Sequence, residues 1–98
     1  MIKEITCQQL KELQAKEPVH IIDVREAEEV AMGKVKGAMH IPLGDIPNRL
    51  HELDKDQRYY LICRSGARSG TACEYLTFLG YDVVNVAGGM LEWDGEIE

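Results

Sequence analysis

YYLICRSGARS, residues 59–69, decides the fold of this chain. Its first part is apolar and rich in strand-forming residues, which predicts a buried strand over Tyr59–Cys63. Small and polar residues with one glycine follow, as in a tight loop. A helix is then expected from about Arg68 to Leu79, ending at Gly80. A strand that passes through a short loop into a helix is the repeating unit of an α/β sheet.

The segments on either side continue this alternation. Further strands are expected over Met1–Ile5, His20–Val24, Ala38–Ile41 and Val83–Val86. Helices are expected from a capping box of Thr6 and Gln9, over Glu26–Met32, from Asp45 with Ile46, Leu50 and Leu53 on one face, and after Gly88-Gly89 with Leu91 and Trp93. The helix that begins near Arg68 should turn Ala72, Tyr75, Leu76 and Leu79 inward. The sequence therefore predicts a single α/β domain, residues 1–98, with an open, mainly parallel central sheet flanked by helices on both faces.

Composition and charge exclude several classes of protein. The longest apolar runs are far shorter than the roughly 18 residues of a membrane helix, and residues 1–4 do not resemble a signal peptide, so we expect a cytoplasmic protein that does not bind membranes. The 17 acidic and 11 basic residues leave a net charge of −6, which argues against nucleic-acid binding. Residues 69–98 contain no Lys or Arg, and we expect this acidic segment to be a solvated face. A small anionic substrate is still compatible with a local cluster of arginines.

The three cysteines, Cys7, Cys63 and Cys73, have no CxxC spacing and no histidine at a zinc-ligand interval. Neither a disulfide framework nor a metal site is predicted. We expect free thiols in a reducing compartment, with Cys7 and Cys73 serving as small buried apolar groups.

Cys63 stands in a different context, because it ends a strand and precedes a short loop and a helix. Successive backbone N–H groups in such a loop can converge on the sulfur, and the free N–H groups of the helix add partial positive charge. Arg64 and Arg68 supply full charges. Since all of these favour a thiolate over a thiol, the sequence predicts a depressed pKa and a nucleophilic Cys63.

Several short motifs occur together in order: Asp23-Val24-Arg25-Glu26, Gly37-Ala38 leading to Ile41-Pro42-Leu43, Cys63-Arg64-Ser65-Gly66 with Arg68-Ser69, Leu79-Gly80-Tyr81, and Gly88-Gly89 with Trp93. Through them the chain resembles a single-domain rhodanese, of the sulfurtransferase superfamily, over nearly its full length. It departs from that pattern at residues 33–37, where the family often has a His and a Pro before the second glycine.

The resemblance implies a persulfide shuttle without a cofactor. Cys63 would take a sulfane sulfur from a donor such as thiosulfate, or from a sulfur-donating protein, and pass it to a thiol or cyanide. The loop residues Arg64, Ser65, Gly66, Ala67 and Arg68 would bind the substrate, with Asp23, Arg25 and Ser69 in support. Arg64 would receive thiosulfate, and Arg68 would face Asp23 and brace the loop. Asp23 and Arg25 could instead form a plain surface ion pair.

Two other functions stay open at this point. The first is a phosphatase or arsenate reductase on the same scaffold, whose signature is C-x5-R, whereas Cys63 and Arg68 read C-x4-R. A smaller ring of N–H groups suits one sulfur atom better than a tetrahedral phosphate. The second is a non-catalytic binding module or a sulfur carrier that acts only when a partner delivers sulfur.

Overall fold

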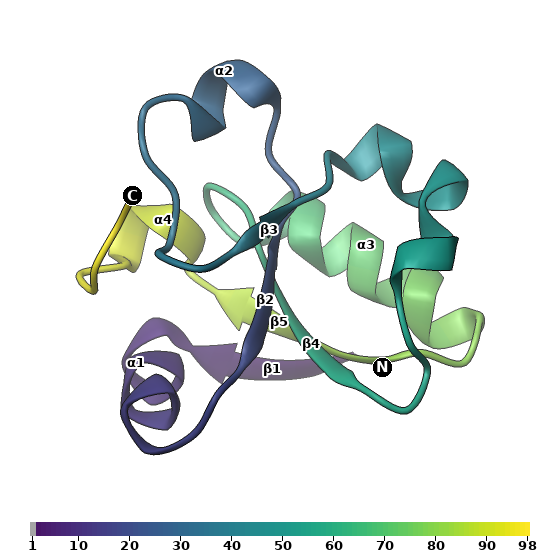
Figure 1. Ribbon diagram of the computed structural model, residues 1–98, viewed down its shortest axis with the longest axis horizontal. Coiled ribbons are helices and arrows are strands. Elements are labelled where there is room, and N and C mark those ends of the chain that lie inside the picture. The colour runs from purple at the N-terminus through teal and green to yellow at the C-terminus, as the bar shows by residue number, and fades with distance from the viewer. Residues whose placement is uncertain (1) are drawn as a thin grey trace.

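A computed structural model describes residues 2–98 as one five-stranded sheet with helices on both faces (Figure 1). The strands are β1 (Lys3–Thr6), β2 (His20–Asp23), β3 (Met39–His40), β4 (Arg58–Ile62) and β5 (Asp82–Ala87), in the order β1-β5-β4-β2-β3. Every neighbouring pair is parallel. The predicted open parallel sheet is therefore confirmed. Met1, which the predicted first strand included, lies outside the described residues.

Two hydrophobic cores fill the two sides of the sheet. On one side, α1 (Cys7–Lys16) and α4 (Gly89–Glu92) pack on a core that includes Leu10, Ile62 and Val86. On the other, α3 (Ala67–Phe78) and the 3-10 helices η1 (Leu43–Asn48) and η2 (Leu50–Glu52) cover a core that includes Leu61 and Leu76. The short α2 (Ala27–Val30) lies beyond the end of β2, away from both cores (Figure 1).

The first predicted helix begins where its sequence signal places it. The Gln9 backbone N–H donates to Thr6 Oγ1 at 3.0 Å, and the Thr6 N–H donates to Gln9 Oε1 at 2.9 Å. This reciprocal pair satisfies two N–H groups that the helix itself leaves free. The capping box is confirmed, and α1 starts at Cys7.

Two of the helix predictions are wrong in detail. The segment after Asp45 forms the 3-10 helices η1 and η2 in place of one α-helix. The first of these begins at Leu43, ahead of Asp45, so Pro47 is its fifth residue and lacks the N–H that an α-helix would bond to the Leu43 carbonyl. Tyr75 does not face inward, since it is 37% exposed. The buried face of α3 is formed by Ser69, Gly70, Ala72, Cys73 and Leu76.

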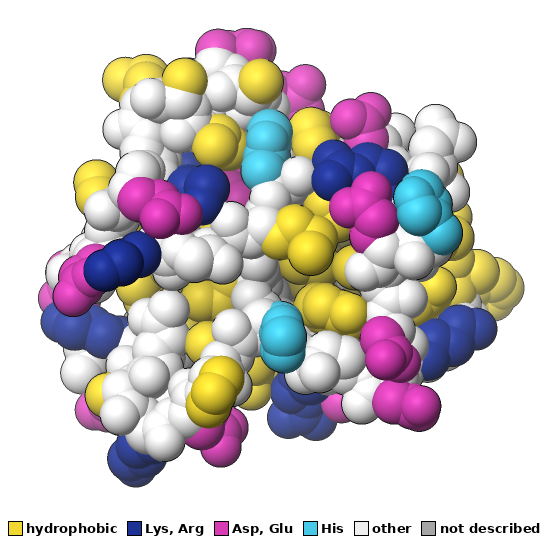
Figure 2. Space-filling model, in the orientation of Figure 1, with side chains coloured by type: hydrophobic (Ala, Val, Ile, Leu, Met, Phe, Trp, Pro, Cys, Tyr) yellow, Lys and Arg dark blue, Asp and Glu magenta, His cyan; other side chains and the backbone are white. Residues whose placement is uncertain are grey.

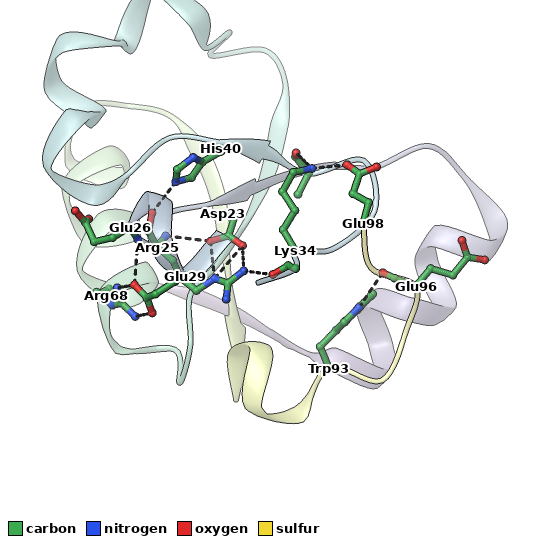
Figure 3. Close-up of polar contacts among 12 residues, drawn as sticks. Asp23, Arg25, Glu26, Glu29, Lys34, His40, Arg68, Trp93, Glu96 and Glu98 are labelled. Carbon is green, nitrogen blue, oxygen red and sulfur yellow. Dashed lines mark hydrogen bonds and ion pairs between the residues drawn. The ribbon is translucent and has the colours of Figure 1, made fainter. Parts of the chain in front are cut away.

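The acidic C-terminal segment is not simply a solvated face. Residues 34–36 and 96–98 run antiparallel, with a bridge between Val35 and Ile97. Acidic side chains of the segment pair with basic ones from the first half of the chain: Asp94 with Lys11, and Glu96 with Lys36. Glu98 pairs with Lys34 (Figure 3). These pairs connect the acidic C-terminal segment to α1 and to the loop that follows α2.

Charges of both signs are interspersed on the face shown in Figure 2, where no continuous basic stripe is visible. Across residues 2–98, no helix combines the length and the apolar character needed to cross a bilayer.

Candidate active site

The predicted site lies where the carboxyl ends of β2 and β4 meet. These strands pair in parallel, and Asp23 is the register partner of Ile62. The residues that follow the two strands, including Cys63, therefore emerge at the same edge of the sheet. This edge is where α/β sheets bind their ligands.

The Cys63 sulfur lies inside a ring of hydrogen-bond donors. The Gly66 N–H donates to Sγ at 3.1 Å, and the N–H and hydroxyl of Ser69 lie at 3.3 Å from it. Gly66 adopts a left-handed backbone conformation, φ 105°, directly before α3. A side chain is strained in that conformation, so the loop can turn this tightly only at a glycine.

The environment of Cys63 shifts its ionisation in the predicted direction. The side chain is fully buried, and burial by itself raises the pKa of a thiol. Hydrogen bonds from the Ser69 hydroxyl, and from the N–H groups of Ser69, Gly66 and Ser65, outweigh burial and hold the pKa of Cys63 below its ordinary value. The loop thus favours the nucleophilic thiolate.

The N-terminus of α4 holds the other side of the loop. The Met90 N–H donates to the Cys63 carbonyl at 2.8 Å, and the Leu91 N–H donates to the Arg64 carbonyl at 3.0 Å. A Cβ on Gly89 would overlap both carbonyl oxygens, so this approach of two backbones requires a glycine. The Cys7 thiol in turn donates to the Gly89 carbonyl at 3.2 Å.

Arg68 braces the loop, but its partner differs from the predicted one. Its guanidinium forms a two-point pair with the Glu29 carboxylate of α2, at 2.6 and 2.8 Å (Figure 3). Hydrogen bonds from Arg68 and from the Glu26 N–H lower the pKa of Glu29 to about 2, and the same pair raises the pKa of Arg68. The predicted contact between Arg68 and Asp23 is wrong, because Asp23 is already occupied.

Asp23 and Arg25 form a buried pair. Arg25 Nη2 donates to Asp23 Oδ2 at 2.8 Å and to the Gly33 carbonyl at 2.7 Å, while the Arg25 backbone N–H donates to Asp23 Oδ1 at 3.0 Å. Both side chains are buried, so the alternative of a surface ion pair is excluded. His40 Nε2 lies 2.7 Å from the Arg25 carbonyl (Figure 3). The Asp23–Arg25 pair therefore fixes the backbone after β2 and leaves Arg25 no free charge for a substrate.

A buried polar chain leads away from the sulfur through Ser69. Asn85 Nδ2 donates to Glu4 Oε2 at 2.9 Å and to the Gly66 carbonyl at 3.2 Å, which places Asn85 Oδ1 toward Ser69 Oγ, 2.5 Å away. Two oxygens at that distance need a proton between them. Since Ser69 has one hydroxyl proton, it can give that proton either to Asn85 or to Cys63, but not to both at once.

The structure thus gathers Cys63, Gly66, Ser69 and the Ser65 N–H around one sulfur. Arg64 and Ala67 are exposed on the outside of the loop. No group of three or more potential metal ligands occurs within residues 2–98.

Sequence reasoning missed two residues of the site. Asn85 gives a usable signal, because it is a polar residue within the apolar run of β5. Glu29 gives none, since nothing in the local sequence says that α2 folds against the start of α3.

This arrangement provides a buried cysteine whose hydrogen-bond donors favour the thiolate, which is suited to nucleophilic attack that leaves an anion on the cysteine. Comparisons with known proteins identify the family of this chain. The family model described as "Rhodanese-like domain" matches residues 6–96. The chain is 53% identical over 96 residues to a Bacillus subtilis protein named "Putative sulfurtransferase YtwF", covering 97% of this chain and 93% of that protein.

Two further matches extend the comparison. A B. subtilis protein named "Putative sulfur carrier protein YrkF" is 38% identical over 99 residues, which span 99% of this chain but 54% of that protein. The crystal structure of a rhodanese-like domain protein from Staphylococcus aureus is similar with a TM-score of 0.93 and 44% identity, covering 99% of this chain and 97% of that one.

Proposed function

Because this chain belongs to the rhodanese-like domain family, we propose that it is a sulfurtransferase that carries sulfane sulfur as a persulfide on Cys63. The family supports a sulfurtransferase or a sulfur-carrier role, and relatives are named accordingly. The observation that carries the proposal is the ring of donors around the Cys63 sulfur. Those donors stabilise the thiolate before transfer and the terminal persulfide anion after it.

The first half of the reaction is an attack of the Cys63 thiolate on the outer sulfur of thiosulfate. A bond forms between Sγ and that sulfur, and the S–S bond of thiosulfate breaks with its electron pair leaving on sulfite. Sulfite is already a stable anion, so no proton has to be delivered to the leaving group. This fits a loop in which the groups that contact the sulfur are N–H and O–H donors.

In the second half, a thiolate or cyanide attacks the terminal sulfur and Cys63 leaves as a thiolate. The same donors stabilise this leaving group, which lets the loop serve both directions of transfer. The sulfur stays covalently attached throughout, and we propose that no cofactor is needed. All three cysteines are free, which fits a reducing compartment such as the cytoplasm.

Intact mass spectrometry before and after thiosulfate tests the proposal directly. We expect a gain of one sulfur atom, located on the peptide that contains Cys63 and removed by cyanide. The Cys63→Ser variant should gain none. A wild-type protein that stays unmodified by thiosulfate and by protein persulfides would contradict the proposal.

A sulfur carrier is the second candidate. One relative is named a sulfur carrier protein, and the match to this chain covers 54% of that relative. A carrier would accept sulfur from a cysteine desulfurase that bears a protein persulfide but would not turn over thiosulfate. The two donors, compared with the same purified protein, separate the candidates. The phosphatase alternative is disfavoured by the C-x4-R spacing, and hydrolysis of a phosphate ester faster than thiosulfate turnover would revive it.

A further inference from the structure

A cavity of about 360 Å³ lies beside the Cys63 loop. It is bordered by Arg64, the residue after the nucleophile, and by Met90, whose N–H is bonded to the Cys63 carbonyl. The rest of its lining comes from β2, α2 and α4 and the residues next to them. The full set is Arg25, Glu29, Met32, Arg64, Met90 and Leu91.

The positive charge of this cavity is smaller than its arginines suggest. Arg25 is bound to Asp23 and to the Gly33 carbonyl. Glu29 is neutralised by Arg68. Within residues 2–98, Arg64 forms no ion pair or hydrogen bond through its side chain, and it is exposed. The cavity thus offers an incoming anion one free guanidinium.

The remaining lining is apolar and open to water. Met32, just after α2, is 88% exposed, and Leu91 of α4 is 64% exposed. Apolar side chains also reach the surface over α2, at the top of Figure 2. Single exposed apolar residues are ordinary on protein surfaces. Two of them from distant parts of the chain that border one cavity beside a nucleophile form a surface that a ligand can cover.

One free guanidinium and an exposed apolar lining together suit a substrate other than an inorganic dianion. Thiosulfate has two negative charges and no apolar part, so it leaves Met32 and Leu91 in water and brings one charge more than Arg64 can match. Resting on the sulfurtransferase function, we propose that this cavity takes an organic sulfur donor with a single negative charge near its sulfane sulfur and an apolar group beyond it. Met32 and Leu91 are then the residues that determine specificity.

The transfer balances for such a donor as it does for thiosulfate. With a thiosulfonate, the Cys63 thiolate attacks the outer sulfur and the new S–S bond forms. The S–S bond of the donor breaks, and its electron pair leaves on the sulfinate, which is a monoanion. The total charge is unchanged, and no proton, oxidant or reductant is consumed.

The test compares benzenethiosulfonate with methanethiosulfonate, which has the same charge but a much smaller apolar group. Thiosulfate is the third donor, and cyanide is the acceptor for all three. Each kcat/KM is divided by the rate at which free cysteine takes sulfur from the same donor, which removes differences in intrinsic reactivity. We expect wild-type protein to favour benzenethiosulfonate over each of the others by about tenfold or more, as hydrophobic pockets favour larger apolar groups.

Variants locate the origin of the preference. The double variant Met32→Ala/Leu91→Ala should lose most of the preference for the benzene compound over the methane compound. Phe78→Ala is the matched control, because Phe78 is 87% exposed at the C-terminal end of α3 and does not line the cavity. It should keep the wild-type ratio. Circular dichroism melting confirms that each variant is folded.

Two outcomes overturn the specificity proposal: a corrected preference for thiosulfate in the wild-type protein, or an unchanged benzene-to-methane ratio in the double variant. Failure of the sulfurtransferase function gives a different result, in which none of the three donors adds sulfur to Cys63 by mass spectrometry. The two failures are therefore distinguishable.

Discussion

Cys63 and Cys73 are ten residues apart, and both side chains are fully buried, yet their ionisation shifts in opposite directions. Burial raises the pKa of Cys73 to about 12, with further contributions from the charges of Glu4 and Cys63. The pKa of Cys63 is lowered, because hydrogen bonds to its sulfur outweigh the same burial. The comparison shows that burial alone disfavours the thiolate, as at Cys73, and that the donors of the loop favour the thiolate at Cys63.

The position of each cysteine relative to a helix explains which has donors. Cys73 lies inside α3, where the backbone N–H groups are already used by the helix. Cys63 precedes α3, so the free N–H groups of the helix start can turn toward it. Cys7 shows that a helix start alone is insufficient, since burial and the charges of Glu92 and Asp94 raise its pKa although it begins α1. The tight loop closed by Gly66 makes the difference.

The largest expected effect comes from replacing Cys63 by serine, and the same replacement at Cys73 is its matched comparison. Cys63→Ser should reduce sulfur transfer by at least about 1000-fold, since a serine hydroxyl is a far weaker nucleophile. Its free energy of unfolding should change by less than about 1 kcal/mol, because the loop donors still have an oxygen acceptor. Cys73→Ser should retain transfer activity and lose about 1–2 kcal/mol of stability, because a hydroxyl replaces an apolar group in the core. Transfer rates and urea unfolding measure both; an active Cys63→Ser protein would remove this residue from the mechanism.

The rate of alkylation against pH sharpens the comparison without a mutation. The midpoint for Cys63 should lie below the ordinary thiol value of about 8.5, because its folded pKa is lowered. Cys73 should stay unmodified up to pH values near its pKa of about 12, and at pH 7 we expect a rate difference of at least about 100-fold. Peptide mass spectrometry after brief iodoacetamide treatment gives both curves.

The lowered pKa of Cys63 also makes the free energy of unfolding depend on pH. A thiol whose pKa is lowered by folding stabilises the folded state above the ordinary thiol pKa, and this contribution is lost as pH falls through the folded pKa. The free energy of unfolding of the wild-type protein should therefore gain a contribution between neutral and mildly alkaline pH, and the Cys63→Ser variant should lack this gain. A Cys63 alkylation midpoint at or above 8.5 would contradict the ring of donors as the cause of reactivity.

Much of this contrast could be predicted from the sequence, because it depends on local order along the chain. The apolar run before Cys63, the glycine in the loop and the helix after it place a thiol at a helix start with no tertiary information. The partner of Arg68 could not be predicted, since Glu29 reaches it only through the folding of α2 onto the site. Pro47 did not exclude the expected helix after Asp45, because a proline in the first turn of a helix has no hydrogen bond to lose. It opposes an α-helix only because the structure begins this segment at Leu43.

The brace formed by Arg68 and Glu29 is expected to have the next largest effect. Arg68→Ala removes a positive charge and leaves the Glu29 carboxylate unpaired beside the loop, so the pKa of Cys63 should rise and kcat/KM should fall about tenfold. The double variant Arg68→Ala/Glu29→Ala should recover part of the loss, because it also removes the unpaired carboxylate. Thiosulfate:cyanide kinetics and alkylation profiles measure both changes. A double variant no better than Arg68→Ala would show that the unpaired Glu29 carboxylate contributes nothing to the loss.

Substitutions at Ser69 and Asn85 test whether Asn85 and Cys63 compete for the one hydroxyl proton of Ser69. Ser69→Ala removes one donor from the sulfur, so the midpoint of the Cys63 alkylation curve should rise by up to about one pH unit. Asn85→Ala removes the competing acceptor and leaves the Ser69 proton to the sulfur, so the midpoint should fall. When Ser69 is already alanine, Asn85→Ala should no longer lower the midpoint of the Cys63 alkylation curve. A midpoint that rises in Asn85→Ala would mean that the Asn85 contact with the Gly66 carbonyl matters more than the proton.

The smallest expected effect belongs to Arg64, whose charge lies outside the ring of donors. Arg64→Ala should lower kcat/KM for thiosulfate about threefold at low salt, leave kcat nearly unchanged, and flatten the dependence of kcat/KM on ionic strength, because an exposed charge acts by attracting the anion. Arg58→Ala is the matched control: it removes the same charge at the amino end of β4, the end opposite Cys63, where Arg58 pairs with Asp82. If the two variants show the same salt profile, net charge and not the position of Arg64 is responsible. A flattened profile in Arg64→Ala alone would separate the capture of the anion from the stabilisation of the thiolate, which the donors around Cys63 perform at any salt concentration.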